Sequence, residues 1–225
     1  MSSKGVKKQL FEQFARVGKS LSSPHRLELL ELLAQSERTV EDLTKLTGLP
    51  VANVSQHLQH LRRAALVITR KAGLYVYYSL SSPHVSELLS AVQRIAESQL
   101  DEVDELVRTY LSSKDDMEPV SRFELLERVR SGLVTVLDVR PVEEYEAGHI
   151  AGAINIPLRE LSKRLHQFER KRPIVAYCRG AYCILAFDAV AKLRAKGFDA
   201  RRLDGGFPEW RHAALPIETH SVGDK

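Results

Sequence analysis

Cysteine and long apolar runs are scarce in this chain of 225 residues. Its two cysteines are too few to staple a fold, which excludes a disulfide scaffold and favours a reducing compartment, the cytoplasm. The longest apolar stretches, such as Ile184–Phe187, fall far short of the roughly 20 residues that span a bilayer, so no membrane association is predicted. The basic N-terminal stretch lacks an apolar segment and is not expected to be a secretory signal.

Acidic residues are also rare in the first third of the chain. Residues 1–80 carry 12 Lys and Arg against 6 Asp and Glu, whereas residues 81–120 carry 3 against 9. No carboxylate occurs between Asp42 and Glu87. A basic, acid-free segment suits a polyanionic partner, although an ordinary mixed surface would account for the charge alone equally well.

A polar and charged segment, 112–119, divides the chain and is typical of a linker. The patterns before it are mostly helical, and after it short β-rich runs alternate with helical runs. We therefore predict two domains, residues 1–112 and 120–225, joined by a linker over 113–119. The first is expected to be mainly α-helical, and the second to be an α/β three-layer domain with a parallel sheet.

Residues 10–80 show the pattern of a helix–turn–helix followed by a β-hairpin. Ser23 with Pro24 predicts the start of one helix, and Thr39 predicts the start of another that ends at Gly48. A further helix is expected over 51–64. Two β-rich runs then flank a Lys-Ala-Gly turn, which predicts a hairpin. Its tip is expected to be basic and to contact the phosphates of a nucleic acid. This order of elements is a winged helix.

The helix predicted over residues 51–64 carries the strongest functional signal. Val54, Leu58 and Leu61 share one apolar face, while the far side carries short amide and imidazole side chains suited to base edges. An ordinary surface helix would more often carry Glu and Lys there. The predicted DNA-binding residues of this helix and the hairpin are Ala52, Asn53, Ser55, Gln56, Gln59, His60, Arg63, Arg70 and Lys71.

The segments 22–27, 43–49, 54–58 and 61–67 together resemble the ArsR family of bacterial repressors. The resemblance covers about residues 10–100. It implies a homodimer that places two recognition helices in successive major grooves of double-stranded operator DNA. The acidic helix expected over 83–111 would be the dimerising one; the alternative is that it packs on its own domain.

Many members of that family bind metal through a Cys pair or through Asp, His and Glu sets. Residues 1–112 contain no Cys, and the histidines among them have no paired metal spacing. No metal site and no cofactor are therefore predicted, and we expect the effector to be sensed in the second domain.

Cys178 follows the β-rich run 174–177 and precedes a helical run over 184–196. Backbone N–H groups and a helix dipole at that position would lower the pKa of the thiol, and a neighbouring arginine adds a cation. We therefore predict an accessible, catalytic thiolate rather than an inert buried cysteine. The predicted active-site loop comprises Cys178, Arg179, Gly180, Ala181, Tyr182 and Cys183.

The segments 137–140, 144–145, 148–157 and 204–210, with the Cys178 loop, resemble a rhodanese domain over about residues 120–218. The resemblance implies that Cys178 attacks a sulfane-sulfur donor, such as thiosulfate, a persulfide or polysulfide, and becomes a persulfide held by loop amides. Related phosphatases carry Arg at the sixth position after the cysteine. Ile184 stands there instead, which disfavours phosphatase chemistry.

Cys183 leaves two interpretations open. It either resolves a Cys178 persulfide, which requires a Cα separation of about 4.4–6.8 Å, or it only packs against the helix.

Two functions of the whole chain are consistent with these motifs. One is a transcriptional regulator whose rhodanese domain senses reactive sulfur or redox state. The other is a sulfurtransferase that passes sulfane sulfur to a thiol or cyanide and regulates its own operon. The remaining prominent residues are expected to be structural: Asp138, Arg140, His149 and Trp210.

Overall fold

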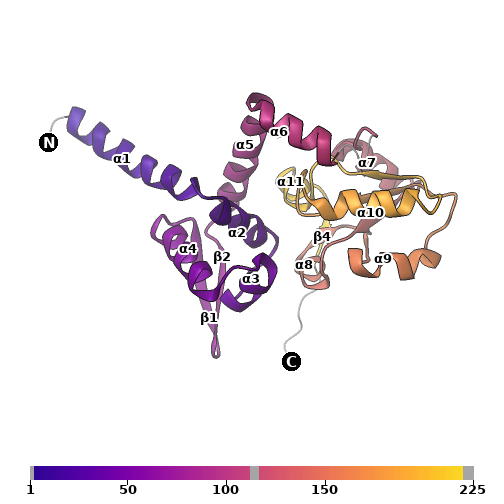
Figure 1. Ribbon diagram of the computed structural model, residues 1–225, viewed down its shortest axis with the longest axis horizontal. Helices are drawn as coiled ribbons and strands as arrows, with labels where there is room; N and C mark the ends of the chain where they lie inside the picture. Colours follow the sequence, from indigo (N-terminus) through magenta and orange to yellow (C-terminus); the bar gives the residue numbers. More distant parts are fainter. Residues whose placement is uncertain (1–2, 112–116, 220–225) are drawn as a thin grey trace. The chain divides into compact units, whose positions relative to one another are not determined.

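The computed structural model describes residues 3–111 and 117–219. The chain divides into two compact units, residues 1–91 and 92–225 (Figure 1). This division falls upstream of the predicted linker, 113–119, most of which lies outside the described residues. The domain bounds derived from composition therefore stay a prediction.

The first unit consists of helices and one hairpin, as predicted for a winged helix. Thr39 caps a helix through a reciprocal pair of hydrogen bonds with Asp42, and Gly48 ends that helix in the left-handed conformation at φ 71°. Ser23 precedes Pro24 as expected, but its hydroxyl makes no capping hydrogen bond. The elements are α1 (Ser3–Leu21), α2 (Pro24–Gln35), α3 (Val40–Thr47), α4 (Val51–Arg63), β1 (Val67–Ala72), β2 (Tyr75–Leu80) and the first part of α5 (Pro83–Gln99).

The core of this unit lies between α2, α3 and α4. Leu29 and Leu43 pack there against the apolar face of α4, and all are fully buried. Val54, Leu58 and Leu61 form that face, which confirms the predicted inward side of the helix. Because these side chains fix the rotation of α4, the opposite side of the helix faces solvent.

The hairpin turn is not where the sequence analysis placed it. Strands β1 and β2 pair antiparallel, and Lys71 and Ala72 still belong to the ladder. The two-residue turn is Gly73–Leu74, because Gly73 adopts the positive φ of 58° that the first turn residue requires. The predicted Lys-Ala-Gly turn is therefore wrong, and the tip carries exposed Leu74 rather than a basic side chain.

The single helix predicted over 83–111 is also wrong. Helix α5 ends at Gln99, and α6 (Asp101–Leu106) and a π-helical turn, η1 (Val107–Leu111), follow. The Ser98 hydroxyl donates to the Ile95 carbonyl at 3.3 Å, and the Gln99 amide donates to the Ser98 carbonyl at 2.9 Å. Such local side-chain bonds compete with the backbone ladder, which accounts for a break at this point.

The second unit is a three-layer α/β domain, as predicted. Its parallel sheet has the order β5 (Ile154–Asn155), β3 (Thr135–Asp138), β6 (Ile174–Tyr177) and β7 (Ala200–Arg202), and β4 (His149–Ile150) pairs separately with β8 (Ile217–Glu218). Besides the end of α5, α6 and η1, its helical elements are α7 (Arg122–Arg130), α8 (Val142–Ala147), α9 (Leu158–Arg164), η2 (Leu165–Gln167), α10 (Ile184–Arg194) and α11 (Phe207–His212).

Alternate side chains of the sheet enter two separate apolar cores. Leu137 and Ala176 point to the core that α9 and α10 cover, whereas Val136 and Val175 point to the core that contains Trp210 of α11. This alternation is the period-two pattern of a strand buried on both faces. The carboxyl ends of β3 and β6 consequently lie at one edge, where the cysteine loop begins.

No helix in the described parts of the chain is both long enough and apolar enough to cross a membrane.

Candidate functional site

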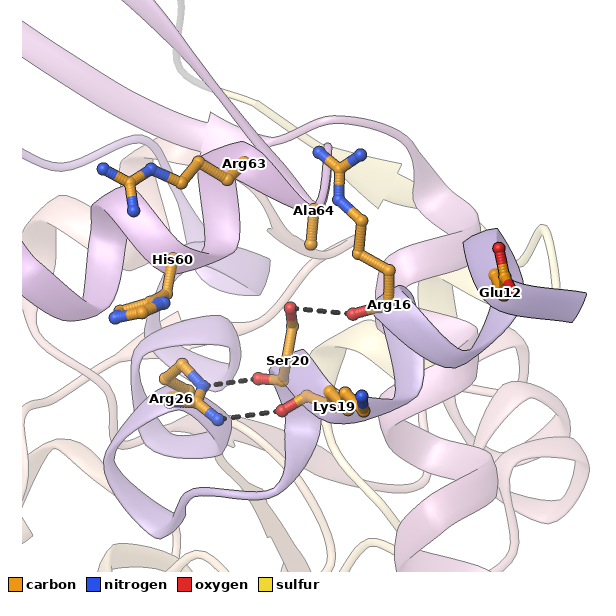
Figure 2. A pocket seen from close by; sticks show the side chains of 8 residues that line it. All are labelled: Glu12, Arg16, Lys19, Ser20, Arg26, His60, Arg63 and Ala64. Carbon is orange, nitrogen blue, oxygen red and sulfur yellow. Dashed lines mark hydrogen bonds between the residues drawn. The ribbon is translucent and has the colours of Figure 1, made fainter. Parts of the chain in front are cut away.

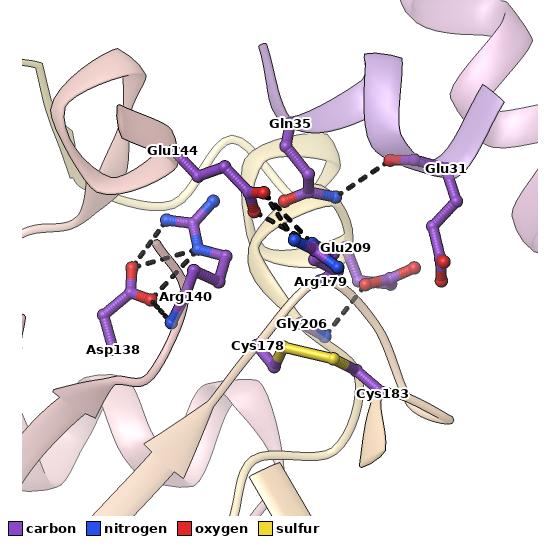
Figure 3. Close-up of a disulfide and its surroundings, with 10 residues drawn as sticks. All are labelled: Glu31, Gln35, Asp138, Arg140, Glu144, Cys178, Arg179, Cys183, Gly206 and Glu209. Atoms are coloured by element: carbon purple, nitrogen blue, oxygen red, sulfur yellow. Dashed lines mark hydrogen bonds and ion pairs between the residues drawn. A yellow bond between two sulfur atoms is a disulfide. The ribbon is translucent and has the colours of Figure 1, made fainter. Parts of the chain in front are cut away.

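The cysteine loop connects β6 to α10 at the carboxyl edge of the parallel sheet. Cys178 follows β6 directly, and Cys183 is the last residue before α10 (Figure 3). A second segment closes on this loop, because the Phe207 N–H donates to the Cys178 carbonyl at 3.0 Å. The loop is thus held between two elements at the edge where parallel α/β sheets place their sites.

Cys178 and Cys183 form a disulfide in this structure, with a Cα separation of 6.1 Å. That separation lies within the range that a disulfide requires. Cys178 is fully buried in the core beneath α10, whereas Cys183 is only half-buried. The prediction of an accessible Cys178 thiolate is therefore wrong for this form of the protein. Helix α10 begins beside Cys183, so its N-terminus lies next to that residue in the chain rather than next to Cys178.

Arg179 does not offer a free cation to the loop, as the sequence analysis expected. Its guanidinium donates to both oxygens of Glu144, at 2.7 to 3.2 Å. Glu144 is fully buried on α8. Glu144 belongs to the segments that resemble rhodanese, but its pairing with Arg179 was not predicted, because the two residues lie 35 positions apart in the chain. The pair offsets the positive charge of Arg179 and fixes the first turn of the loop.

The remainder of the loop presents unused backbone donors. The Cys183 N–H donates to the Gly180 carbonyl at 3.2 Å. The N–H groups of Gly180, Ala181 and Tyr182 donate to no acceptor within the described residues. Burial raises the pKa of the Tyr182 hydroxyl above its usual value, which keeps that group neutral. Backbone N–H groups without an intramolecular acceptor are the donors that anion-binding loops use.

Asp138, Arg140, His149 and Trp210 occupy structural positions, as expected. Arg140 donates to both oxygens of Asp138 and to the Gly148 carbonyl, and the Asp138–Arg140 pair is fully buried. Although burial acts to lower the pKa of Arg140, the Asp138 carboxylate raises it. The His149 ring stacks on Tyr145, and the Trp210 indole donates to the Pro216 carbonyl at 2.8 Å.

Gly206 packs against the cysteine loop so closely that no side chain fits. A Cβ at this position would lie 2.6 Å from the Cys178 carbonyl oxygen and would also collide with the Gly180 nitrogen. The replacement Gly206→Ala is expected to destabilise this unit by about 1–3 kcal/mol, because the backbone must shift to relieve the overlap. Thermal unfolding followed by the fluorescence of Trp210, the one tryptophan of the chain, measures the loss.

Gly18→Ala is the matched control, because a Cβ at Gly18 on α1 meets nothing within 4 Å. Equal transition temperatures for the two variants would show that the loop tolerates displacement at Gly206.

The residues predicted to read DNA form a continuous exposed face on α4. Six of them are exposed and Ser55 is half-buried: the six are Ala52, Asn53, Gln56, Gln59, His60 and Arg63. The N-terminal half of the helix presents Asn53 and Gln56, and its last turn presents Arg63. No carboxylate lies on this helix, so the face offers hydrogen-bonding groups and positive charge only.

The two basic residues of the hairpin differ in whether a carboxylate pairs with their side chain. Arg70 forms an ion pair with Glu37 and lies 5.0 Å from the ring centre of Tyr77. The Glu37 carboxylate raises the pKa of Arg70. Lys71 is exposed, and no ion pair of its side chain occurs within the described residues. Glu37 was not predicted as a partner of Arg70, because it lies 33 positions earlier in the chain and reaches the hairpin only through the fold.

Comparisons with known proteins identify both units. The arsR-family bacterial regulatory protein model matches residues 23–69, and the rhodanese-like domain model matches residues 121–213. The chain is 46% identical over 212 residues to the HTH-type transcriptional regulator Rv0324 of Mycobacterium tuberculosis, covering 94% of this chain and 93% of that protein.

Two solved structures resemble the separate units. The homodimeric winged helix-turn-helix DNA-binding domain Mb0332 of Mycobacterium bovis is 39% identical, with a TM-score of 0.41 over 44% of this chain and 91% of that one. A rhodanese-related protein from Thermoplasma volcanium is 29% identical, with a TM-score of 0.41 over 45% of this chain and 98% of that one. The family matches and the near full-length relative show that this chain belongs to the ArsR family of bacterial transcriptional regulators and carries a C-terminal rhodanese-like domain.

Proposed function

We propose that this regulator binds double-stranded operator DNA through α4 and the β1–β2 hairpin. The exposed amides of Asn53 and Gln56 have the donors and acceptors that distinguish base edges in the major groove. Arg63 and Lys71 carry positive charge on the flanks of that face and suit phosphate contacts. The absence of carboxylates from residues 43–86 supports the same assignment.

The DNA-binding form is a homodimer in this proposal. Helix α1 exposes an apolar face of Val6, Leu10, Phe11 and Phe14, whose exposed fractions lie between 42% and 62%. A contiguous apolar face of this kind marks an interaction site. The resemblance implied the helix over 83–111 as the dimerising one, but Val85 and Leu89 at its start pack in the core of their own unit. A second copy of α1 is the occupant that we propose, because a symmetric dimer presents two α4 helices to successive grooves of DNA.

The rhodanese-like unit senses reactive sulfur or redox state in this proposal. The observation that carries it is the bond between the only two cysteines of the chain, which lie at the two ends of one loop. A disulfide inside that loop gives the unit two covalent states, the reduced dithiol and the disulfide. The free amides of Gly180 to Tyr182 favour a third state, in which an anionic persulfide lies in the loop.

The chemistry proceeds in two balanced steps. The Cys178 thiolate attacks the terminal sulfur of a polysulfide, takes up that sulfur as Cys178–S–S⁻, and releases a polysulfide shorter by one sulfur. The Cys183 thiol then attacks the Cys178 Sγ and forms the Cys178–Cys183 disulfide, and the outer sulfur leaves with the thiol proton as hydrosulfide. No other cysteine is available to resolve the persulfide.

The test compares operator affinity in two redox states. A duplex selected from a random pool by the reduced protein is titrated before and after polysulfide treatment, with fluorescence anisotropy as the readout. We expect the wild-type affinity to change by at least about fivefold, the lower range of ordinary coupling between sites. Cys178→Ser should show no such change, because it can form neither the persulfide nor the disulfide. Cys183→Ser can form only the persulfide and therefore shows which of the two states alters the affinity.

Gln56→Ala serves as the control for base recognition. It should weaken binding to the selected duplex by about tenfold in both redox states, because it removes one base contact without touching the cysteine loop. A wild-type affinity that stays constant after complete oxidation, verified by mass spectrometry, would overturn the sensing role and leave DNA binding intact.

A sulfurtransferase enzyme is the alternative, and one observation weighs against it. Arg179 is paired with Glu144 instead of being available to hold an anionic donor. Steady-state transfer of sulfur from thiosulfate to cyanide by the full chain distinguishes the two functions. Uptake of one sulfur without turnover supports the sensor, whereas turnover at ordinary enzymatic rates, roughly 1–1,000 per second, supports the enzyme.

A further inference from the structure

A basic pocket lies in the first unit between the end of α1, the start of α2 and the end of α4 (Figure 2). We call it the α1–α4 pocket. Its volume of about 320 Å³ equals the liquid volume of about ten water molecules. The charged and titratable groups that line it are Glu12, Arg16, Lys19, Arg26, His60 and Arg63. The lining therefore carries an excess of positive charge even with a neutral imidazole.

Arg26 forms one wall of the pocket and is committed to the fold. Its guanidinium donates to the carbonyls of Ser20 at 2.6 Å and Lys19 at 3.0 Å, in the last turn of α1. Figure 2 shows both bonds. They satisfy carbonyls that a helix end leaves without partners, and they tie the start of α2 to α1. The pocket is thus a fixed feature of the unit.

The remaining cations of the pocket have no partner of their own. Within the described residues, the side chains of Arg16, Lys19 and Arg63 make no hydrogen bond or ion pair. Figure 2 shows Arg16 from α1 and Arg63 from α4 on the two sides of Ala64. Several unpaired cations around one hollow repel one another, and an anion in that hollow would relieve the repulsion.

The surroundings of the pocket are positive as well. Burial lowers the pKa of His57 on α4, and electrostatic repulsion from neighbouring His25, Arg26 and His60 lowers that pKa further. The α4 helix that lines the pocket lies entirely within the acid-free segment of the chain. Glu12 is the only carboxylate among the lining residues.

The pocket is continuous with the proposed DNA-reading face. His60 and Arg63 belong to both, since they lie in the last turns of α4 on its exposed side. On α1, at 100° per residue, Arg16 and Lys19 lie on the side opposite to Leu10 and Phe14. A second copy packed on the apolar face of α1 would therefore leave the pocket side of that helix uncovered.

We propose that the α1–α4 pocket binds one phosphate of the DNA backbone, so that α1 extends the DNA interface beyond α4 and the hairpin. The inference rests on the DNA binding proposed above and adds a site to it. Arg16 and Lys19 supply the new contacts, and Arg63 joins them from α4. Such a contact fixes the orientation of the protein on the duplex and carries no sequence information itself.

The experiment measures the salt dependence of DNA binding by the full, reduced chain. Affinity for a random-sequence duplex is determined between about 0.05 and 0.2 M salt, because each phosphate contact contributes about one unit to the slope of log K against log salt. Arg16→Gln and Lys19→Gln are each expected to reduce that slope by about one per protomer. Glu12→Gln should raise affinity, because it removes the one carboxylate of the pocket.

Lys8→Gln is the matched control, since it removes a cation from α1 about 12 Å along the helix from Arg16 and outside the pocket. A wild-type protein without salt-dependent binding would refute DNA binding as a whole. Normal wild-type binding with the same slope in Arg16→Gln as in Lys8→Gln would overturn the pocket contact alone.

A second arm separates DNA phosphate from a free anion. Thermal unfolding of the full chain is followed with inorganic phosphate and with chloride at equal ionic strength. Stabilisation by phosphate that Arg16→Gln abolishes, together with an unchanged DNA slope, would assign the pocket to a free oxyanion and refute the DNA contact. A reduced slope in Arg16→Gln supports the proposal whatever free phosphate does.

Discussion

Asp138→Asn is expected to lower the free energy of unfolding of the rhodanese-like unit by about 3–5 kcal/mol. The fully buried Arg140 guanidinium would then lose the carboxylate that accepts its hydrogen bonds through both oxygens. The rings of Tyr177 and Phe207, with centres 5.5 and 4.6 Å from that guanidinium, cannot replace a carboxylate. Denaturant unfolding followed by Trp210 fluorescence measures the change.

Two further variants establish the cause of this loss. Glu146→Gln on α8 removes an exposed carboxylate and should change stability by less than about 0.5 kcal/mol. The double replacement Asp138→Leu with Arg140→Met should recover part of the loss, because it removes both buried charges together. A single variant Asp138→Asn that loses less than about 1 kcal/mol would show that the pair contributes little to this fold.

Glu144→Gln is expected to lower the free energy of unfolding by about 2–3 kcal/mol, because it weakens hydrogen bonds between a charged guanidinium and a fully buried side chain. Its second effect concerns the cysteine loop. Glu144 would no longer offset the positive charge of Arg179, which is adjacent to Cys178, and this change favours the thiolate form of the neighbouring thiol. We therefore expect faster disulfide formation in the reduced variant than in the wild type at the same polysulfide concentration.

Alkylation-trapped mass spectrometry measures that rate, and denaturant unfolding measures the stability. Glu143→Gln, one residue earlier and exposed, is the control for both readouts. Slower disulfide formation in Glu144→Gln would mean that the ion pair assists the chemistry by holding the loop in place.

Local signals in the sequence identified most of the elements. Thr39, Gly48 and Pro24 mark helix ends through chemistry that acts within a few residues, and the structure confirms those ends. The apolar spacing of Val54 and Leu58 fixed which side of α4 faces solvent. The order of strands and helices after residue 120 predicted a parallel α/β sheet, because short crossovers leave few other arrangements.

Contacts between residues far apart in the chain could not be predicted from these local signals. Cys178 stands at the end of a strand as expected, but its burial depends on the Gly206 segment, 28 positions later, packing over it. The partners of Arg179 and Arg70 are carboxylates that lie 35 and 33 positions away. Spacing along the chain contains no information on these contacts, which arise only when the sheet and the hairpin have formed.

The unequal burial of the two sulfurs determines which of them an incoming reductant meets. A bulky thiol such as glutathione reaches half-buried Cys183 and is excluded from Cys178 beneath α10. Attack on Cys183 Sγ leaves the glutathione adduct on that residue and expels Cys178 as the leaving thiolate, inside the core. A small reductant and a bulky one should therefore reopen the loop through the same residue, and any trapped mixed disulfide should map to position 183.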